Sequence, residues 1–354
     1  MFPALRRAVN RFLPAHFHDP LGLARRLVRS GHPAARFAMA AALGGVIAWP
    51  LDRLLEPFER RRYRRAPRPS RPLVLVCGAP RSGTTIVALT LIRYLPVAYF
   101  PNLTSLFPRS PLTAMALFGG VLPPERRPLE NYYGRTAGLG GPNDALYVWD
   151  RWLGADRMTV PSRLSPEQIA AMRRFVGAAE AFFGRPLVAK NNALHASAHL
   201  VAEALPEARF LCLEREPVAL AQSLLRARLE IHGADTIAYG LSAPGARYAA
   251  ADRVLESVAR QVVFHERIAA AQRARLGPDR FRTISYEEFC AAPAPLVRDV
   301  GAGMLGLDPS AMMEGPAPYP VSRRPYLPPD AAHRLAELLD RVRAESSPSS
   351  VSGR

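Results

Sequence analysis

A short apolar run followed by a glycine-rich turn, "RPLVLVCGAPRSGTT" at residues 71–85, limits the folds open to this chain. The apolar run is typical of a strand buried in a parallel sheet. Residues 84–95 then carry apolar side chains at helical spacing. A strand, a glycine-rich turn and a helix in that order place free backbone N–H groups at a helix N-terminus, which binds anions. The segment therefore predicts an α/β fold with an anion-binding loop.

The rest of the chain alternates between strand-like and helix-like segments. We expect further strands in 185–190, 208–214 and 280–285. We expect helices in 165–184, 193–205, 217–229, 248–276, from 286 onward, and in 329–343. This alternation predicts a P-loop-like three-layer sandwich, with a central, mostly parallel sheet flanked by helices. Residues 101–164 are rich in proline, glycine and aromatic residues, and we expect irregular loops there.

Composition divides the chain into three parts. Residues 72–345 carry the alternating pattern, residues 1–71 form a basic N-terminal segment, and residues 346–354 are expected to be a disordered tail. The 15 residues at 37–51 carry no charge, which is short of the roughly 20 that span a bilayer. An arginine cluster follows at 59–71. Two interpretations stay open: a short helix attached to an anionic membrane surface, or a core helix followed by a solvated linker.

The chain has 47 basic and 30 acidic residues, and its formal net charge is +17. Such a charge favours anionic partners, namely nucleotides, nucleic acid or an anionic membrane. Nearly all of the basic residues are arginine, and Lys190 is the single lysine. No nucleic-acid-binding motif accompanies the charge, so we expect no nucleic-acid partner.

Cysteine and histidine spacing indicates no metal site. Cys77, Cys212 and Cys290 lack the spacing of metal ligands, and we expect buried, reduced thiols in a cytoplasmic protein. His195 and His199 lie one helical turn apart, but no third ligand accompanies them. We therefore expect a reaction that uses no metal ion.

The turn after the first strand differs from a nucleoside-triphosphate loop at one position. Gly78 and Gly83 have the spacing of the pattern G-x-x-x-x-G-K-[ST], but Thr84 stands where the lysine belongs. A cation lies two residues before Gly83 instead, at Arg81. Hydroxyl groups follow in Ser82, Thr84 and Thr85. An arginine and several hydroxyls, without a set of magnesium ligands, favour a compact oxyanion on a 5′ chain.

A second cluster follows the strand at 208–214. Arg215 stands at the end of this strand, Pro217 begins the next helix, and Ser223 lies eight residues after Arg215. An arginine and a helix-borne serine can hold a second phosphate through charge-assisted hydrogen bonds. Taken alone, such an arginine is also typical of a solvated or ion-paired residue.

Together, the two clusters resemble the nucleotide motifs of sulfotransferases that use 3′-phosphoadenosine 5′-phosphosulfate (PAPS). "APRSGTT" is similar to the 5′-phosphosulfate loop of the bacterial branch, which reads G-x-P-R-S-G-T-T, and Arg215 and Ser223 match the 3′-phosphate motif. "YEEFCAAP", which begins at Tyr286, resembles a segment near the end of the family's domain. "AKNNALH" resembles a segment in which Lys190 matches the family's lysine. The resemblance covers residues 72–328.

The resemblance implies in-line transfer of a sulfuryl group from PAPS to a hydroxyl or amine group, without a metal ion. It implies that PAPS is bound by Arg81, Ser82, Gly83, Thr84, Thr85, Arg215, Ser223 and Tyr286. Arg81 is expected to neutralise the leaving phosphate and the transferring group. Two roles stay open for Lys190: it reaches the same region, or it pairs with a carboxylate.

The acceptor hydroxyl also needs a base, and Asp144 is the first candidate. "GGPNDALYVWDRWLG" at 140–154 resembles an acidic segment of the bacterial branch, although the glutamate that is usual there is missing. Two roles that do not exclude each other stay open: Asp144 accepts the proton, and Asn143 or Asp144 caps the helix that follows. His195 is a weaker candidate for the base.

Two other functions stay open as alternatives. A P-loop kinase or NTPase is disfavoured by Thr84 and by Glu214, which ends its strand where a magnesium-binding aspartate is expected. A non-enzymatic protein that binds nucleic acid or membranes is disfavoured by the lack of a binding motif. For the acceptor, the apolar stretch, the arginine cluster and the aromatic-rich region 94–153 favour a small molecule or a lipid, such as a glycolipid. The expected location is cytoplasmic, with attachment to the cytoplasmic face of the membrane left open.

Overall fold

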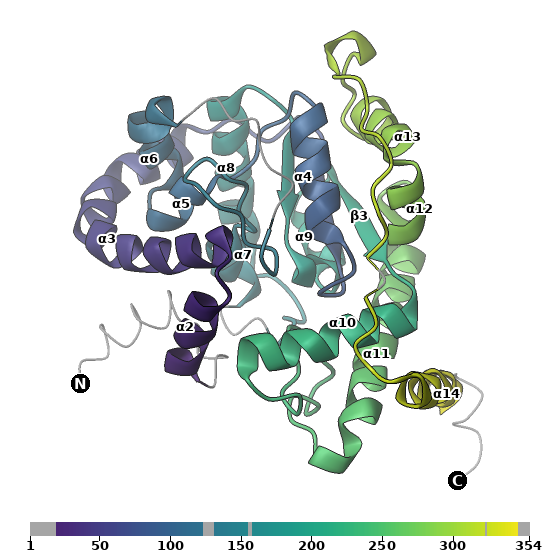
Figure 1. Ribbon diagram of the computed structural model, residues 1–354. Coiled ribbons are helices and arrows are strands. Elements are labelled where there is room, and N and C mark those ends of the chain that lie inside the picture. Colours follow the sequence, from purple (N-terminus) through teal and green to yellow (C-terminus); the bar gives the residue numbers. More distant parts are fainter. Residues whose placement is uncertain (1–18, 123–130, 155–157, 323, 346–354) are drawn as a thin grey trace.

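Within the residues that the structure describes, four parallel strands form the centre of the fold (Figure 1). The structure is a computed structural model that describes residues 19–122, 131–154, 158–322 and 324–345. The strands are β1 (Leu73–Gly78), β2 (Leu187–Lys190), β3 (Ala208–Glu214) and β4 (Phe281–Ser285), in the order β2-β1-β3-β4. The expected parallel sheet is confirmed, and each strand lies within a residue or two of its expected bounds. The tail at 346–354 lies outside the described residues.

Helices cover both faces of the sheet, as expected for a three-layer sandwich. Successive side chains of a strand point to opposite faces. Leu73 and Leu75 of β1 pack against α8 and α9, whereas Val74 and Val76 pack against α4, α12 and α13. These helices are α4 (Thr84–Tyr94), α8 (Pro166–Phe183), α9 (Ala198–Ala204), α12 (Tyr286–Ala291) and α13 (Pro293–Arg298). Because both faces are covered, every residue of β1 is buried.

A further group of helices packs beside the carboxyl edge of the sheet (Figure 1). It consists of α10 (Pro217–Ala227), α11 (Val254–Leu276) and α14 (Pro329–Glu345). Short turns of helix connect the larger elements: η3 (Arg228–His232), η4 (Ala251–Arg253), η5 (Asp299–Met304) and η6 (Pro309–Ala311). The helix expected at 248–276 begins six residues later than expected, at Val254, because the short turn η4 precedes it. The helix expected at 193–205 is divided into η2 (Asn192–His195) and α9.

The expectation of irregular loops in 101–164 is wrong, apart from the helix that was expected to follow Asp144. This region contains α5 (Asn102–Leu106), α6 (Pro111–Phe118), η1 (Gly119–Val121) and α7 (Leu146–Leu153). The helices α5, α6 and η1 are too short to show a clear helical period in the sequence, whereas α7 is the helix that was expected after Asp144. They form because α5 and α6 pack on the N-terminal helix α3, and because Trp149 and Trp152 of α7 enter the core.

The N-terminal region holds α2 (Pro20–Arg29) and the 33-residue helix α3 (Pro33–Arg65). The expectation of a short helix followed by a linker is wrong, because the arginine cluster up to Arg65 forms the last turns of α3. Arginine is a good helix former, and its charge is favourable near a helix C-terminus. Pro50 and Pro57 lie inside α3, which bends as it passes α5 and α6 (Figure 1). By length and composition alone, α3 could cross a bilayer.

Two buried carboxylates attach α3 to the body of the protein. Asp52 accepts hydrogen bonds from the backbone N–H groups of Arg109 and Ser110, at 3.0–3.2 Å. Glu59 accepts hydrogen bonds from the N–H groups of Leu112 at 3.1 Å and Thr113 at 2.7 Å. These donors belong to the N-terminus of α6, where a helix leaves N–H groups without intrahelical acceptors. The carboxylates therefore cap α6 and fix it to α3.

The three cysteines are buried, as expected. Cys77 and Cys212 are partners in the register of β1 and β3. Burial raises the pKa of the Cys77 thiol, which keeps it protonated and unreactive at neutral pH.

We expect the substitution Glu59→Gln to lower the free energy of unfolding by about 1–3 kcal/mol, because an amide group directs N–H toward the buried donors of α6. Urea unfolding measures this free energy, provided that its slope against urea concentration is the same in the variant and the original protein. The matched control is Glu56→Gln, because Glu56 forms surface ion pairs with Arg60 and Arg109. Loss of such pairs costs about 0–1 kcal/mol. Equal losses in the two variants would contradict the capping role of Glu59.

Candidate functional site

The loop between β1 and α4 has an unusual backbone. Gly78, Arg81 and Gly83 have φ values of 135°, 74° and 101°. A Cβ atom at position 83 would lie 2.3 Å from Cδ2 of Tyr286, so glycine is required there. Arg81 adopts the left-handed region without being glycine, and such strained residues concentrate at functional sites. The loop then enters α4, whose first N–H groups have no intrahelical acceptor.

The predicted loop residues have different surroundings. Ser82 is fully buried, and its hydroxyl donates to the carbonyl of Ala79 at 2.8 Å, so this hydroxyl holds the loop together. Thr84 donates its hydroxyl hydrogen to Oδ1 of Asn192 at 2.7 Å, which connects the loop to the end of β2. Gly83, Thr84, Thr85 and the side chain of Arg81 face a cavity.

Structure brings the two sequence clusters into direct contact. Nε of Arg81 donates to Oγ of Ser223 at 3.2 Å, and the guanidinium lies 4.6 Å from the ring centre of Tyr133. Arg215 donates from Nη1 to the carbonyl of Arg81 at 2.9 Å and lies 4.9 Å from the ring centre of Tyr286. Burial lowers the pKa of Arg215, although the guanidinium keeps its charge near neutral pH. Residues 142 positions apart in the sequence thus form one site.

These residues line a cavity of about 590 Å3, here called the basic cavity. Among the described residues, its basic side chains are Arg81, Lys190, Arg215, Arg226 and Arg324. Its acidic side chains are Glu216 and Glu287, and Glu216 already accepts hydrogen bonds from the first N–H groups of α10. The surplus of positive charge and the helix N-terminus of α4 suit a ligand with several anionic groups.

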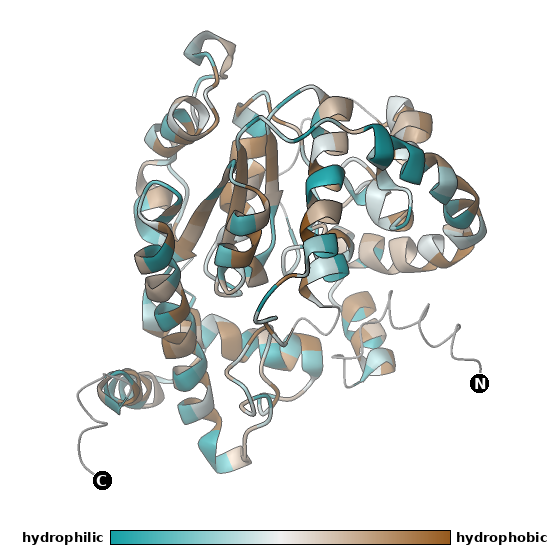
Figure 2. Ribbon diagram, turned by 180° about the vertical axis from the view of Figure 1, so that it is seen from behind, coloured by the Kyte–Doolittle hydropathy of each residue, from teal (hydrophilic) through white to brown (hydrophobic). Residues whose placement is uncertain are grey.

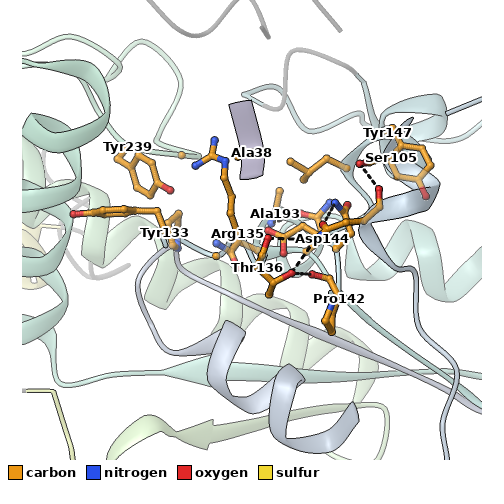
Figure 3. A pocket seen from close by; sticks show the side chains of 18 of the residues that line it. Ala38, Ser105, Tyr133, Arg135, Thr136, Pro142, Asp144, Tyr147, Ala193 and Tyr239 are labelled. Carbon is orange, nitrogen blue, oxygen red and sulfur yellow. Dashed lines mark hydrogen bonds between the residues drawn. The ribbon is translucent and has the colours of Figure 1, made fainter. Parts of the chain in front are cut away.

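A second cavity of about 370 Å3 adjoins the first, and is here called the acceptor-side cavity (Figure 3). Tyr133 and Tyr239 stand at one end of this cavity, Ser105 and Tyr147 at the other, and Asp144 lies between them (Figure 3). One wall comes from α3, through Phe37, Ala38, Ala41 and Ala42. Its lining is thus a mixture of apolar side chains with a few polar groups, which is typical of small-molecule sites.

An ion pair lies where the two cavities meet. Nζ of Lys190 lies 2.8 Å from both carboxylate oxygens of Asp144. Lys190 lines the basic cavity and Asp144 lines the acceptor-side cavity. Tyr133, Gly134, Asn192 and Tyr239 line both. A Cβ atom at Gly134 would lie 3.0 Å from Nζ of Lys190, so a side chain at this position would displace the ion pair.

The geometry distinguishes the two roles considered for Asp144. Both of its carboxylate oxygens face Lys190, and the N-cap of α7 is Ala145. Asn143, by contrast, accepts a hydrogen bond from the N–H of Ala145 at 2.7 Å. The expected capping role for Asp144 is therefore wrong, and its carboxylate belongs to the boundary between the cavities.

His195 is buried and already hydrogen-bonded. Its Nδ1 lies 2.6 Å from the carbonyl of Asn192, which fixes the hydrogen on Nδ1. Its Nε2 then accepts from Nδ1 of His265 at 2.9 Å. Burial lowers the pKa of His195 to about 4 and that of His265 well below its ordinary value. His199 bonds to Gln272 instead, and the described residues contain no group of three metal-ligating side chains.

Several residues of the site were not identified from the sequence. Tyr133, Gly134 and Tyr239 come from loops without a periodic pattern, and Arg226 and Arg324 resemble the many surface arginines of this chain. Asn192 had a signal in the sequence, because it lies two residues after Lys190 within the matched segment "AKNNALH".

Known proteins share both the sequence pattern and the fold. The sequence profile described as "Sulfotransferase family" matches residues 72–308, well over half of the chain. The sulfotransferase STF9 from Mycobacterium avium is 17% identical, with a TM-score of 0.51 over 87% of this chain and 85% of that chain. The sulfotransferase STF1 from Mycobacterium tuberculosis H37Rv is 14% identical, with a TM-score of 0.50 over 93% of this chain and 92% of that chain. No match was found among curated proteins.

We expect the buried histidine pair to make folding stability depend on pH. Because the folded state holds His195 with a pKa of about 4, the unfolded chain binds more protons below its ordinary pKa of about 6.5. The stability that the neutral His195 contributes is complete above the ordinary pKa of about 6.5, and it is lost as the pH falls toward 4. His195→Asn should therefore reduce the loss of unfolding free energy between about pH 7 and 5 by about 2 kcal/mol.

Urea unfolding at several pH values measures this difference. The control is His333→Asn, because the His333 side chain is 78% exposed. An unchanged pH dependence in the His195→Asn variant would rule out the neutral buried pair.

Proposed function

Because the chain belongs to the sulfotransferase family, we propose that it transfers a sulfuryl group from PAPS to a hydroxyl or amine group of an amphiphilic acceptor. The observation that carries this proposal is the Lys190–Asp144 ion pair, which has its cation on the basic cavity and its carboxylate on the neighbouring cavity. A transfer reaction needs two substrates that meet at one point, and the two cavities meet at this pair.

The basic cavity fits a nucleotide that is anionic at both its 5′ and 3′ ends. The N-terminus of α4, with the backbone of Gly83 to Thr85 and the hydroxyl of Thr85, supplies donors for the 5′ end. Arg215 and Ser223 supply a charged and a neutral donor for the 3′-phosphate. Tyr286 supports this arrangement by packing against both Gly83 and Arg215. Thr84, in place of the usual lysine, separates this loop from triphosphate loops that bind magnesium.

Positioning and electrostatic stabilisation carry most of the proposed catalysis. PAPS supplies the sulfuryl group. Its S–O bond to the phosphate breaks as a new bond to the acceptor forms, an S–O bond for a hydroxyl or an S–N bond for an amine. Arg81 offsets the negative charge that develops on the leaving phosphate. Lys190 has three N–H donors, of which Asp144 occupies at most two, so at least one can point into the basic cavity.

Asp144 is the proposed general base. Its carboxylate lines the acceptor-side cavity and takes the proton that the acceptor hydroxyl loses as the new bond forms. Lys190 holds this carboxylate in position through two contacts of 2.8 Å. His195 is less suited, because its Nε2 is already occupied by His265 and its burial disfavours the protonated form.

We expect the variant Arg215→Met to bind 3′,5′-bisphosphoadenosine about 10- to 100-fold more weakly, since one charge-assisted hydrogen bond is worth about 1.5–3 kcal/mol. Its affinity for adenosine 5′-phosphate, which has no 3′-phosphate, should stay within about threefold of the original protein. Isothermal titration calorimetry measures both affinities. The control Arg185→Met removes an exposed arginine that does not line the basic cavity, and it should change neither affinity. Equal losses for the two ligands, or tighter binding of ATP with magnesium, would contradict the proposal.

We expect Asp144→Asn to lower kcat by about 10²- to 10⁴-fold, the range for loss of a general base. Affinity for 3′,5′-bisphosphoadenosine should be unchanged, because Asp144 lies on the other side of the ion pair. Steady-state kinetics with PAPS and titration with the bisphosphate separate the two effects. The exposed Asp279 provides a matched Asp→Asn control. Near-normal turnover of Asp144→Asn would show that another group takes the proton.

A further inference from the structure

Helix α3 presents two different faces. Its inner face carries Gly45, Asp52, Leu55 and Glu59, which are buried and recur every three to seven residues. Its outer face carries exposed large apolar side chains at complementary positions: Leu43, Val46, Ile47, Trp49, Leu51, Leu54 and Phe58. Of the most apolar 18-residue stretch of α3, only 17% is buried. The outer face is therefore an apolar stripe that no described element of the protein covers.

Arginines stand at both ends of this stripe. Arg36 lies two helical turns before Leu43, and Arg61 and Arg65 lie one and two turns after Phe58. All three arginines are exposed. Figure 2 shows α3 brown and white along most of its length and teal at its arginine-rich end. An apolar stripe between basic residues is complementary to a membrane surface with anionic headgroups.

The inner face argues against a helix that spans the bilayer. Asp52 and Glu59 are 1% and 0% exposed and accept hydrogen bonds from backbone N–H groups at the start of α6. A spanning α3 would have to leave these partners and carry both carboxylates into hydrocarbon, which is strongly unfavourable. While these contacts hold, α3 lies flat against the domain and only its outer face is available.

The same helix forms a wall of the acceptor-side cavity. Phe37, Ala38, Ala41 and Ala42 line that cavity from α3. Figure 3 shows the segment at Ala38 next to the cavity that contains Asp144. These wall residues end at Ala42, and the outer apolar stripe begins at Leu43. The cavity wall and the stripe therefore adjoin along the same helix.

We propose that α3 docks flat on an anionic lipid bilayer through its outer apolar stripe and the arginines at its ends, and that this orientation lets a hydroxylated lipid enter the acceptor-side cavity from the leaflet. The docking stands on the surface of α3 alone. The identity of the acceptor as a membrane lipid rests on the proposed sulfuryl transfer.

Co-sedimentation with lipid vesicles tests the docking. We expect the protein to sediment with vesicles of phosphatidylcholine mixed with phosphatidylglycerol, and more weakly with phosphatidylcholine alone. Ile47 is 72% exposed. Ile47→Asp should weaken binding at least about tenfold, because it removes one large apolar side chain from the lipid contact. The double variant Arg61→Gln, Arg65→Gln should lose roughly fivefold per arginine on anionic vesicles.

Met313→Asp is the matched control, because Met313 is 61% exposed and lies outside the N-terminal helices. Its vesicle binding should equal that of the unchanged protein. Failure of the unchanged protein to sediment with either vesicle would overturn the docking. Vesicle binding by Ile47→Asp as strong as that of the unchanged protein would also overturn the docking. If Ile47→Asp altered the oligomeric state and not vesicle binding, the stripe would be an interface between two copies of the chain, which would overturn the docking too.

Mass spectrometry of bacterial cells that express the protein tests the source of the acceptor. We expect new sulfated species in the organic extract, and several-fold less of them with Ile47→Asp, although this variant binds 3′,5′-bisphosphoadenosine normally. Sulfated products confined to the aqueous fraction would overturn a lipid acceptor. No sulfated product in either fraction, together with no binding of the bisphosphate, would overturn the proposed sulfuryl transfer, and the sedimentation result would still decide the docking.

Discussion

Strand β1 is paired with parallel strands on both sides, and this constraint places the site. Parallel strands end at a common edge, so the segments that follow β1, β2 and β3 leave the sheet together. The register sets Val76 opposite Lys190 and Gly78 opposite Leu213, which brings the loop of Arg81 between Lys190 and Arg215. The chain can make the turn so close to β3 because Gly78 has no side chain: a Cβ atom there would lie 2.6 Å from the carbonyl of Leu213.

Much of this arrangement could be predicted from the sequence, since it depends on local patterns. Buried strands appear as apolar runs, and Arg81, Arg215 and Ser223 stand at fixed distances after two of them. The wall formed by Tyr133 and Gly134 could not be predicted in this way. Their loop has no period, and its place is set by contacts with Arg81 and Lys190, which are distant in the sequence.

Helix α3 shows why charge alone misled the prediction of its length. Asp52 directly follows the uncharged stretch at 37–51, yet its carboxylate is the point where the helix is bonded to α6. A buried charge inside an apolar helix is stable when donors surround it, and here the N-terminus of α6 supplies them. The acidic residues thus mark the inner face, and the exposed leucines and isoleucine mark the outer one.

Tyr133 and Gly134 line both cavities, so neither cavity can change its shape there without changing the other. Tyr133 also has a φ of 50° and packs on Arg81, which leaves its backbone few alternative positions. If a ligand in one cavity moves this wall, the affinity of the other cavity for its ligand changes, and thermodynamic linkage makes the coupling equal in both directions. The factor by which a ligand in the basic cavity changes the affinity for the acceptor equals the factor by which the acceptor changes the affinity for that ligand.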